Sequence, residues 1–244
     1  MRFWWAILAL LFPCLGISSE VTFDRYNISI TGAIAPGDAD KFRAVVRAKS
    51  SWSRVDLDSP GGDIAEAVKI AEIIKILYLE TRVAPGKICA SACSMMWLAG
   101  APRRAVSKEG LGRITKLGLS GAGGIVGLHR PYLTRFDSVT SKQSEVMKQV
   151  QNYLEAQMMP RRLIDLMMSR PSNDIYWLNF KDLQDLGEYR PDVEEFLISK
   201  CDYVRATDDA FSRGLSAEQM IKAGECSSGY LIELHRKAMV SFKK

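Results

Sequence analysis

Hydrophobic and polar positions follow two different periods in the first third of the chain. In NISITGAI (27–34) apolar and polar residues alternate, as in a half-buried strand. In DADKFRAVVRA (38–48) and IAEAVKIAEIIKIL (64–77) apolar residues recur every three or four positions, as in a helix packed on one face. Between them, RVDLDSPGGD (54–63) predicts a strand that stops at a Pro-Gly-Gly turn. This order of strands and helices favours right-handed crossovers and an α/β fold with a mainly parallel sheet.

The rest of the chain predicts shorter elements of both kinds. Strands are expected in LETRVAP (79–85) and IVGLHRP (125–131), and a buried helix in ASACSMMWLAG (90–100). A helix is expected over 139–170, with a break at Pro160. The following segment has a strand-like start at 172–177 and then a short helix that ends at Gly187. A last helix is expected over 217–244, with a break near Gly224.

One glycine-rich segment interrupts this pattern. Residues 107–124, SKEGLGRITKLGLSGAGG, have weak periodicity and predict a flexible loop or insertion, which is expected to cover or border the candidate site described below. We therefore expect one α/β domain over residues 20–200, containing this insertion, and a C-terminal helical extension over 201–244.

The N-terminus has the outline of a secretory signal. Arg2 is followed by an apolar run over 3–15, and small residues stand at Gly16 and Ser18. The run is shorter than the roughly 20 residues that a membrane-spanning helix needs. The pattern predicts a signal peptide over 1–18, cleaved after about Ser18, and a periplasmic or secreted protein. An uncleaved anchor is the alternative.

The cysteines agree with export. Beyond Cys14, an even number remains, and an oxidising compartment favours their pairing. Cys201 and Cys226 are expected to form a disulfide with each other. Cys89 and Cys93 are four positions apart and form either a second disulfide or two buried thiols.

Charge and composition exclude several classes of function. The net charge is +5, and the local basic excess at 103–116 has no interleaved aromatic residues, which argues against nucleic-acid binding. The chain has only two histidines, which argues against a structural zinc site. The motifs described below imply no metal or cofactor.

Three places along the chain carry residues suited to catalysis. Gly61-Gly62 follows a strand, where backbone N–H groups of glycines can face a ligand, although a plain turn is the commoner reason for such a pair. Ser91 stands at the start of a buried helix, and His129 at the end of a strand. A small residue in a tight helix start and a structural histidine are the ordinary explanations for these two.

Taken in order, the motifs DSPGGDIAEAVKIAEII, CASACSMMWLAG and GLHRP resemble those of the Clp-type serine peptidases of the crotonase-like superfamily. The resemblance covers roughly residues 27–190. It implies a fold of repeated β-β-α units with a mainly parallel sheet and a C-terminal helical segment. It also implies that Ser91, nine positions before Gly100, is the nucleophile, and that His129 is the base. Gly61 and Gly62, together with the N–H of Ala92, would form the oxyanion hole.

The resemblance also implies a third catalytic residue. The family places an aspartate after the long helix, and Asp174 occupies that segment here, one residue out of step with the family pattern. Asp165 and Asp182 are the alternatives. Two further departures are a longer interval between serine and histidine, which the glycine-rich segment accounts for, and the cysteines that flank the serine.

These observations lead to one main hypothesis and two alternatives. The main hypothesis is an exported serine hydrolase that cleaves peptides or proteins, of the periplasmic Clp-like branch. No ATP-driven unfoldase is expected as a partner, because the periplasm lacks ATP, and the resemblance implies a homo-oligomer, a trimer or ring. The alternatives are a non-catalytic binding or scaffold protein of the same fold and an acyl-CoA enzyme, against which export argues.

Overall fold

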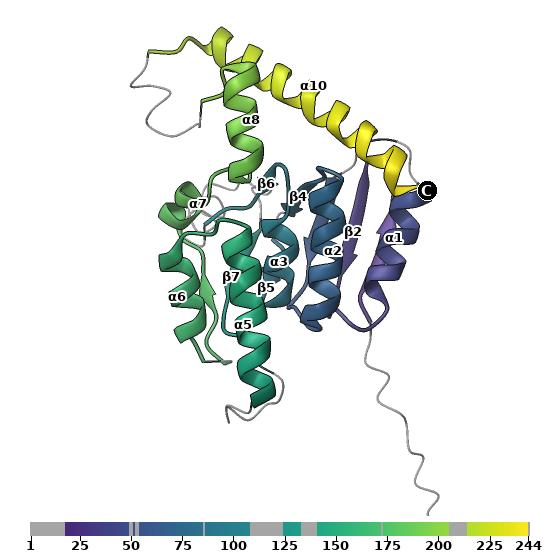
Figure 1. Cartoon of the computed structure of the whole chain (residues 1–244), viewed down its shortest axis with the longest axis vertical. Helices are drawn as coiled ribbons and strands as arrows, with labels where there is room; N and C mark the ends of the chain where they lie inside the picture. The colour runs from purple at the N-terminus through teal and green to yellow at the C-terminus, as the bar shows by residue number, and fades with distance from the viewer. Residues whose placement is uncertain are drawn as a thin grey trace, which may run out of the picture.

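The computed structural model describes residues 18–48, 51, 54–84, 86–107, 124–132, 141–171, 173–204 and 214–243. The expected signal peptide, apart from Ser18, and the glycine-rich insertion, apart from its two end residues, lie outside this part of the chain. The described residues form a mixed α/β fold with a parallel-rich sheet and a long C-terminal helix (Figure 1).

Among the described residues, the larger sheet has five strands in the order β1-β2-β3-β4-β6. Only β1 runs antiparallel to its neighbour, and the other pairs are parallel. The alternation read from the sequence is present, since Ile28 and Ile30 of β2 are buried. The strands span Glu20–Phe23 (β1), Asn27–Thr31 (β2), Arg54–Asp58 (β3), Glu80–Val83 (β4) and Arg103–Arg104 (β6).

The helices that connect these strands form where the apolar period predicts them. They are α1 (Asp38–Ala48), α2 (Ile64–Ile76) and α3 (Ala92–Leu98). Asp63 caps α2 by accepting a hydrogen bond from the N–H of Glu66 at 3.0 Å, which fixes the helix start directly after the Gly-Gly turn. All seven residues of α3 are buried, so this helix passes through the core.

A smaller sheet of order β5-β7-β8 places the ends of several strands close together. It consists of β5 (Ile88–Ala90), β7 (Ile125–Leu128) and β8 (Tyr176–Trp177). Ser59, just after β3, donates to the carbonyl of Ile88 at 2.8 Å and accepts from the N–H of Ala90 at 3.0 Å. The chain segments that leave β3, β5 and β7 therefore meet in one region.

The remaining helices complete the fold after β7. They are α5 (Ser141–Ala156), α6 (Arg161–Ser169), α7 (Phe180–Leu186), α8 (Pro191–Cys201) and α10 (Ala217–Phe242). The break at Pro160 is confirmed, because Pro160 separates α5 from α6. The predicted break at Gly224 is wrong. A single glycine costs a helix only about 1 kcal/mol, and a capping box at Ser216 fixes the start of an uninterrupted α10.

Helix α10 crosses the fold from α8 to the neighbourhood of α1 (Figure 1). The Sγ atoms of Cys201 in α8 and Cys226 in α10 lie 2.06 Å apart, the distance of a disulfide bond. At the other end, Arg47 of α1 lies over the ring of Phe242. None of the helices in the described part of the chain is long and apolar enough to cross a membrane.

Candidate active site

Ser91 occupies the turn between β5 and α3 in a backbone conformation that side chains rarely adopt. Its φ is 56° and its ψ is −127°. A non-glycine residue held there costs about 1–3 kcal/mol, and such strain collects at functional sites. Hydrogen bonds on both sides hold it, because Ser91 N–H donates to the carbonyl of Gly127 at 3.0 Å and Ser94 N–H donates to the carbonyl of Ser91 at 2.9 Å. A sharp strand-to-helix turn of this kind presents a serine hydroxyl outward from a sheet.

Gly61 lies directly against this serine turn. A Cβ at Gly61 would stand 2.6 Å from the Cβ of Ser91 and 3.0 Å from the nitrogen of Ala92. The φ of Gly61 is +101°, in the region that favours glycine. Only glycine at this position therefore lets the turn after β3 approach the proposed nucleophile so closely.

Two backbone N–H groups beside Ser91 remain available. In the turn after β3, the N–H groups of Ser59, Gly61 and Asp63 all donate within the fold. The N–H groups of Gly62 and of Ala92, the first residue of α3, have no hydrogen-bond partner among the residues that the structure describes. A pair of free N–H groups next to a serine is the donor set that an oxyanion hole requires.

His129 follows β7 with a defined tautomer. Its Nδ1 lies 2.8 Å from the carbonyl oxygen of Arg130. A carbonyl oxygen can only accept, so Nδ1 carries the proton and Nε2 keeps its lone pair. The residue is only 5% exposed, and this burial lowers the pKa of the ring below its usual value of 6.5, against the opposing effect of the Arg130 hydrogen bond. At neutral pH His129 is therefore an unprotonated base.

One cavity of about 780 Å³ brings these groups together, within the range of ligand sites. Ser91, Ala92, Gly62 and His129 all line it. Much of the remaining wall is apolar and comes from α2 and α5, through Ile64, Ala65, Val68, Val146, Val150 and Tyr153. The cavity can therefore take an apolar group next to a serine, a neutral histidine and the N–H groups of Gly62 and Ala92, which no described residue engages.

The structure does not bring Asp174 to the histidine. Its carboxylate pairs with Nη1 of Arg170 at 2.5 Å and is about half exposed. The position that an orienting carboxylate would occupy at Nδ1 of His129 is taken by the Arg130 carbonyl. Sequence reasoning could not find this acceptor, because a backbone carbonyl leaves no residue-type signal.

The two alternative aspartates also have other partners. Asp165 pairs with Arg161 on the surface of α6. Asp182 is buried and accepts hydrogen bonds from Asn179 N–H at the start of α7 and from the hydroxyl of Tyr176. Both carboxylates have structural roles in the described contacts.

Two features of the site went beyond the sequence expectations. The first is the wall from α5, whose residues Val146, Val150 and Tyr153 follow the i, i+4, i+7 spacing of one helix face, a signal that was present in the sequence. The second is a disulfide between Cys89 and Cys93, with an S–S distance of 1.99 Å. The sequence had left that pairing open against two free thiols.

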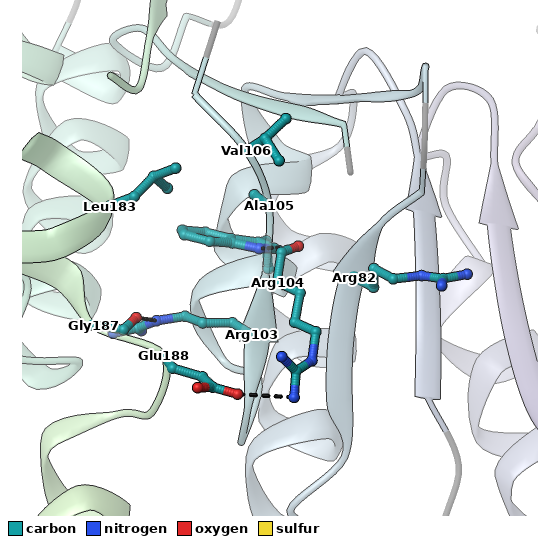
Figure 2. A pocket seen from close by; sticks show the side chains of 9 residues that line it. Arg82, Arg103, Arg104, Ala105, Val106, Leu183, Gly187 and Glu188 are labelled. Carbon is teal, nitrogen blue, oxygen red and sulfur yellow. Dashed lines mark hydrogen bonds and ion pairs between the residues drawn. The ribbon is translucent and has the colours of Figure 1, made fainter. Parts of the chain in front are cut away.

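A second cavity, of about 410 Å³, lies between β6 and α7 and is rich in arginine (Figure 2). Its cations are already engaged. Arg82 pairs with Asp56, Arg104 pairs with Glu80 and Glu188, and the guanidinium of Arg103 donates to backbone carbonyls. The three guanidinium groups of this cavity therefore have hydrogen-bond or ion-pair partners within the fold. Within the described ranges, no cluster of three or more histidine, cysteine, aspartate or glutamate side chains is placed to hold a metal ion.

The lowered pKa of His129 predicts the pH dependence of the site. Nε2 accepts a proton only when the ring is neutral, so the rate of Ser91 acylation should be constant at high pH and fall as pH drops through the pKa. Because burial lowers this pKa, the midpoint should lie below 6.5. Phosphonylation of Ser91 by a fluorophosphonate depends on the same base, and its rate over pH 4.5–8.5 measures this midpoint.

The same titration tests the role of Asp174. A carboxylate beside the ring would favour the imidazolium and raise the midpoint. A midpoint above 6.5 that falls in Asp174→Asn would contradict the geometry at Nδ1 and restore Asp174 as the orienting group.

Comparisons with known proteins give distant likenesses only. No protein-family model matches the chain, and no curated protein matches it. Among solved structures, ClpP1 from Listeria monocytogenes is similar over 67% of this chain and 88% of its own, with 16% identity and a TM-score of 0.46, and a point mutant of it gives 0.44. A mutant of the membrane-bound stomatin-specific protease 1510-N is similar over 73% of this chain and 84% of its own, with 16% identity and a TM-score of 0.49. Such values assign neither family nor function, so the function below rests on the site itself.

Proposed function

We propose that this chain is a serine peptidase with a crotonase-like fold. One observation carries the proposal: Ser91 is held at a positive φ at the edge of a cavity that it shares with a buried, neutral His129 and two N–H groups that have no partner among the described residues. Each of these is a recurring part of acyl-transfer sites. A tight helix start that serves packing alone would need neither the strained serine nor the free N–H groups.

In the proposed reaction, the hydroxyl oxygen of Ser91 attacks the carbonyl carbon of a peptide bond, and Nε2 of His129 takes the hydroxyl proton. The Arg130 carbonyl keeps the ring in the required tautomer. The negative oxygen of the tetrahedral intermediate accepts hydrogen bonds from Gly62 N–H and Ala92 N–H. The intermediate collapses to an ester on Ser91 while His129 gives the proton to the leaving amine. His129 then takes a proton from a water molecule that attacks the ester, and returns it to the oxygen of Ser91 as the acid leaves.

The cavity wall favours a substrate with an apolar group beside the cleaved bond. Val68 of α2 and Val146 and Val150 of α5 supply apolar surface on the wall that also holds Ser91. An apolar side chain buried there gains roughly 1.5–3 kcal/mol relative to water. The proposed substrates are accordingly peptides or unfolded protein segments.

The two disulfides favour an oxidising compartment. Together with the N-terminal pattern, the disulfides support export to the periplasm or beyond. No ATP-driven unfoldase is included as a partner, because the periplasm lacks ATP. The proposal includes a homo-oligomer. Export also argues against the acyl-CoA alternative.

A substrate screen tests the activity. The purified mature chain is incubated with a peptide library and with p-nitrophenyl esters, beside a sample pretreated with a fluorophosphonate. Cleavage of peptides after apolar residues, abolished by the pretreatment, is expected. Hydrolysis of esters alone would replace the peptidase by an esterase. No turnover of either substrate, in protein that keeps its melting temperature, would favour the scaffold alternative.

A further inference from the structure

We infer that the Cys89–Cys93 disulfide is a positioning element for the nucleophile, which holds Ser91 in the conformation needed for acylation. The inference rests on the proposed function and adds to it a covalent constraint on the serine turn. Neither cysteine touches substrate in this account, so the disulfide acts only through the backbone of the residues it encloses.

The placement of the disulfide around Ser91 is the first observation. Cys89 lies within β5 and Cys93 is the second residue of α3, so the bond joins the strand to the helix across the turn. The ring that it closes contains only Ala90, Ser91 and Ala92 besides the two cysteines. One neighbour of Ser91 is Ala92, the proposed oxyanion donor. The other is Ala90, whose N–H donates to the carbonyl of Ser59.

The backbone conformation of Ser91 is the second observation. An L-residue at φ 56° and ψ −127° tends to relax to a negative φ unless its surroundings prevent this. Three noncovalent constraints act here: the hydrogen bond to Gly127, the bonds from Ser94, and the contact with Gly61. The disulfide adds a covalent limit on the separation of strand and helix. A small displacement of a reacting group can cost about a hundredfold in rate.

Burial of both cysteines is the third observation. Each is fully buried, so the bond is protected from reductants while the protein is folded. Such burial fits a disulfide that stays formed in the folded protein, because a disulfide that thiols open and close would need an exposed sulfur. The disulfide therefore acts as a constant constraint on the serine turn once the exported protein has folded.

The chain contains a matched control in its other disulfide. Cys201–Cys226 has a sequence separation of 25, against 4 for Cys89–Cys93. Loop-closure entropy grows with the length of the closed loop, so loss of Cys201–Cys226 should lower the melting temperature more. The Cys201–Cys226 bond joins α8 to α10, and neither helix contributes a residue to the Ser91 cavity.

The test compares Cys89→Ala/Cys93→Ala with Cys201→Ala/Cys226→Ala. Phosphonylation of Ser91 by a fluorophosphonate over a concentration series gives a maximal rate and a half-saturating concentration. The first variant should lose about 10- to 100-fold in maximal rate with little change in half-saturation. The second should keep the wild-type rate and lose more in melting temperature. An unchanged rate in the first variant, or losses in both that follow their melting temperatures, would overturn the inference.

Hydrogen exchange separates this inference from the proposed function. If wild-type protein is never labelled by the fluorophosphonate, the proposed function fails, and hydrogen exchange at Ser91 N–H still tests whether the disulfide holds the serine turn. Faster exchange at Ser91 N–H in Cys89→Ala/Cys93→Ala, but not in Cys201→Ala/Cys226→Ala, supports the inference. Equal exchange in the two variants refutes it. If the alanine pair does not fold, the Cys201→Ala/Cys226→Ala protein, which keeps Cys89–Cys93, is reduced by dithiothreitol in mild denaturant, which yields two cysteine thiols and cyclic oxidised dithiothreitol. After dilution of the denaturant, the same two readouts decide.

Discussion

Ser91→Ala and His129→Ala are each expected to lower the rate of covalent labelling by a fluorophosphonate at pH 7.5 by at least about 1,000-fold. Without Ser91, the cavity has no nucleophile beside the two free N–H groups. Without His129, the hydroxyl keeps its proton, because a serine without a base is a poor nucleophile at neutral pH. Stopped-flow or gel-based labelling with purified protein measures both rates.

His235→Ala is the control for the second substitution. His235 is the other histidine of the chain, it is buried, and its Nδ1 contacts a backbone carbonyl, that of Leu77, at 2.7 Å. Burial lowers its pKa too, yet it does not line the Ser91 cavity. His235→Ala should reduce the melting temperature and leave acylation intact. If it lowers acylation as much as His129→Ala does, the loss reports folding and the assignment of His129 as base is refuted.

Gly62→Ala is expected to destabilise the protein by about 4 kcal/mol and to abolish acylation. The φ of Gly62 is +140°, which L side chains rarely adopt. A Cβ there would also overlap the backbone of Ile34, which cannot move without breaking its hydrogen bonds to Gly61 and Asp63. The turn would shift, and with it the N–H group assigned to the oxyanion. Denaturant unfolding and acylation kinetics give the two values.

Gly37→Ala separates backbone strain from this overlap. Gly37 also has a positive φ, +93°, but a Cβ there would meet no atom within 4 Å. It should cost about 1–2 kcal/mol and leave acylation unchanged. If Gly62→Ala costs no more than Gly37→Ala and the site still reacts, the turn after β3 does not form the oxyanion hole as proposed.

The sequence predicted the elements whose signals are local and long. Helices α1 and α2 begin where predicted, because their apolar period runs over three turns and Asp63 provides a side-chain cap. Strand β5 was missed, since three residues between a glycine turn and a buried helix carry no period of their own. Helix α8 and the two-residue strand β6 were missed too, and they depend on tertiary contacts for their formation.

The candidate site was predictable to the extent that side chains identify it. Ser91, Gly62 and His129 stand out by type and position, and the fold brings them to one cavity. The third catalytic residue was not predictable in this way. Asp174 has the right type and an approximate position, but Arg170 lies four residues before it and pairs with it, while His129 finds its acceptor in the backbone of the next residue. Ion pairing and backbone direction decide such contacts, and residue spacing does not reveal them.

The most direct test of the account is the site of covalent labelling in folded wild-type protein. After fluorophosphonate treatment, reduction and trypsin digestion, the peptide 88–103 contains both Ser91 and Ser94, and fragment ions distinguish the two. The account predicts one adduct, on Ser91, because the Ser94 hydroxyl is buried and donates to the carbonyl of Ser91 at 2.6 Å. An adduct on another serine, or none in folded protein, would contradict the assignment of Ser91 as nucleophile.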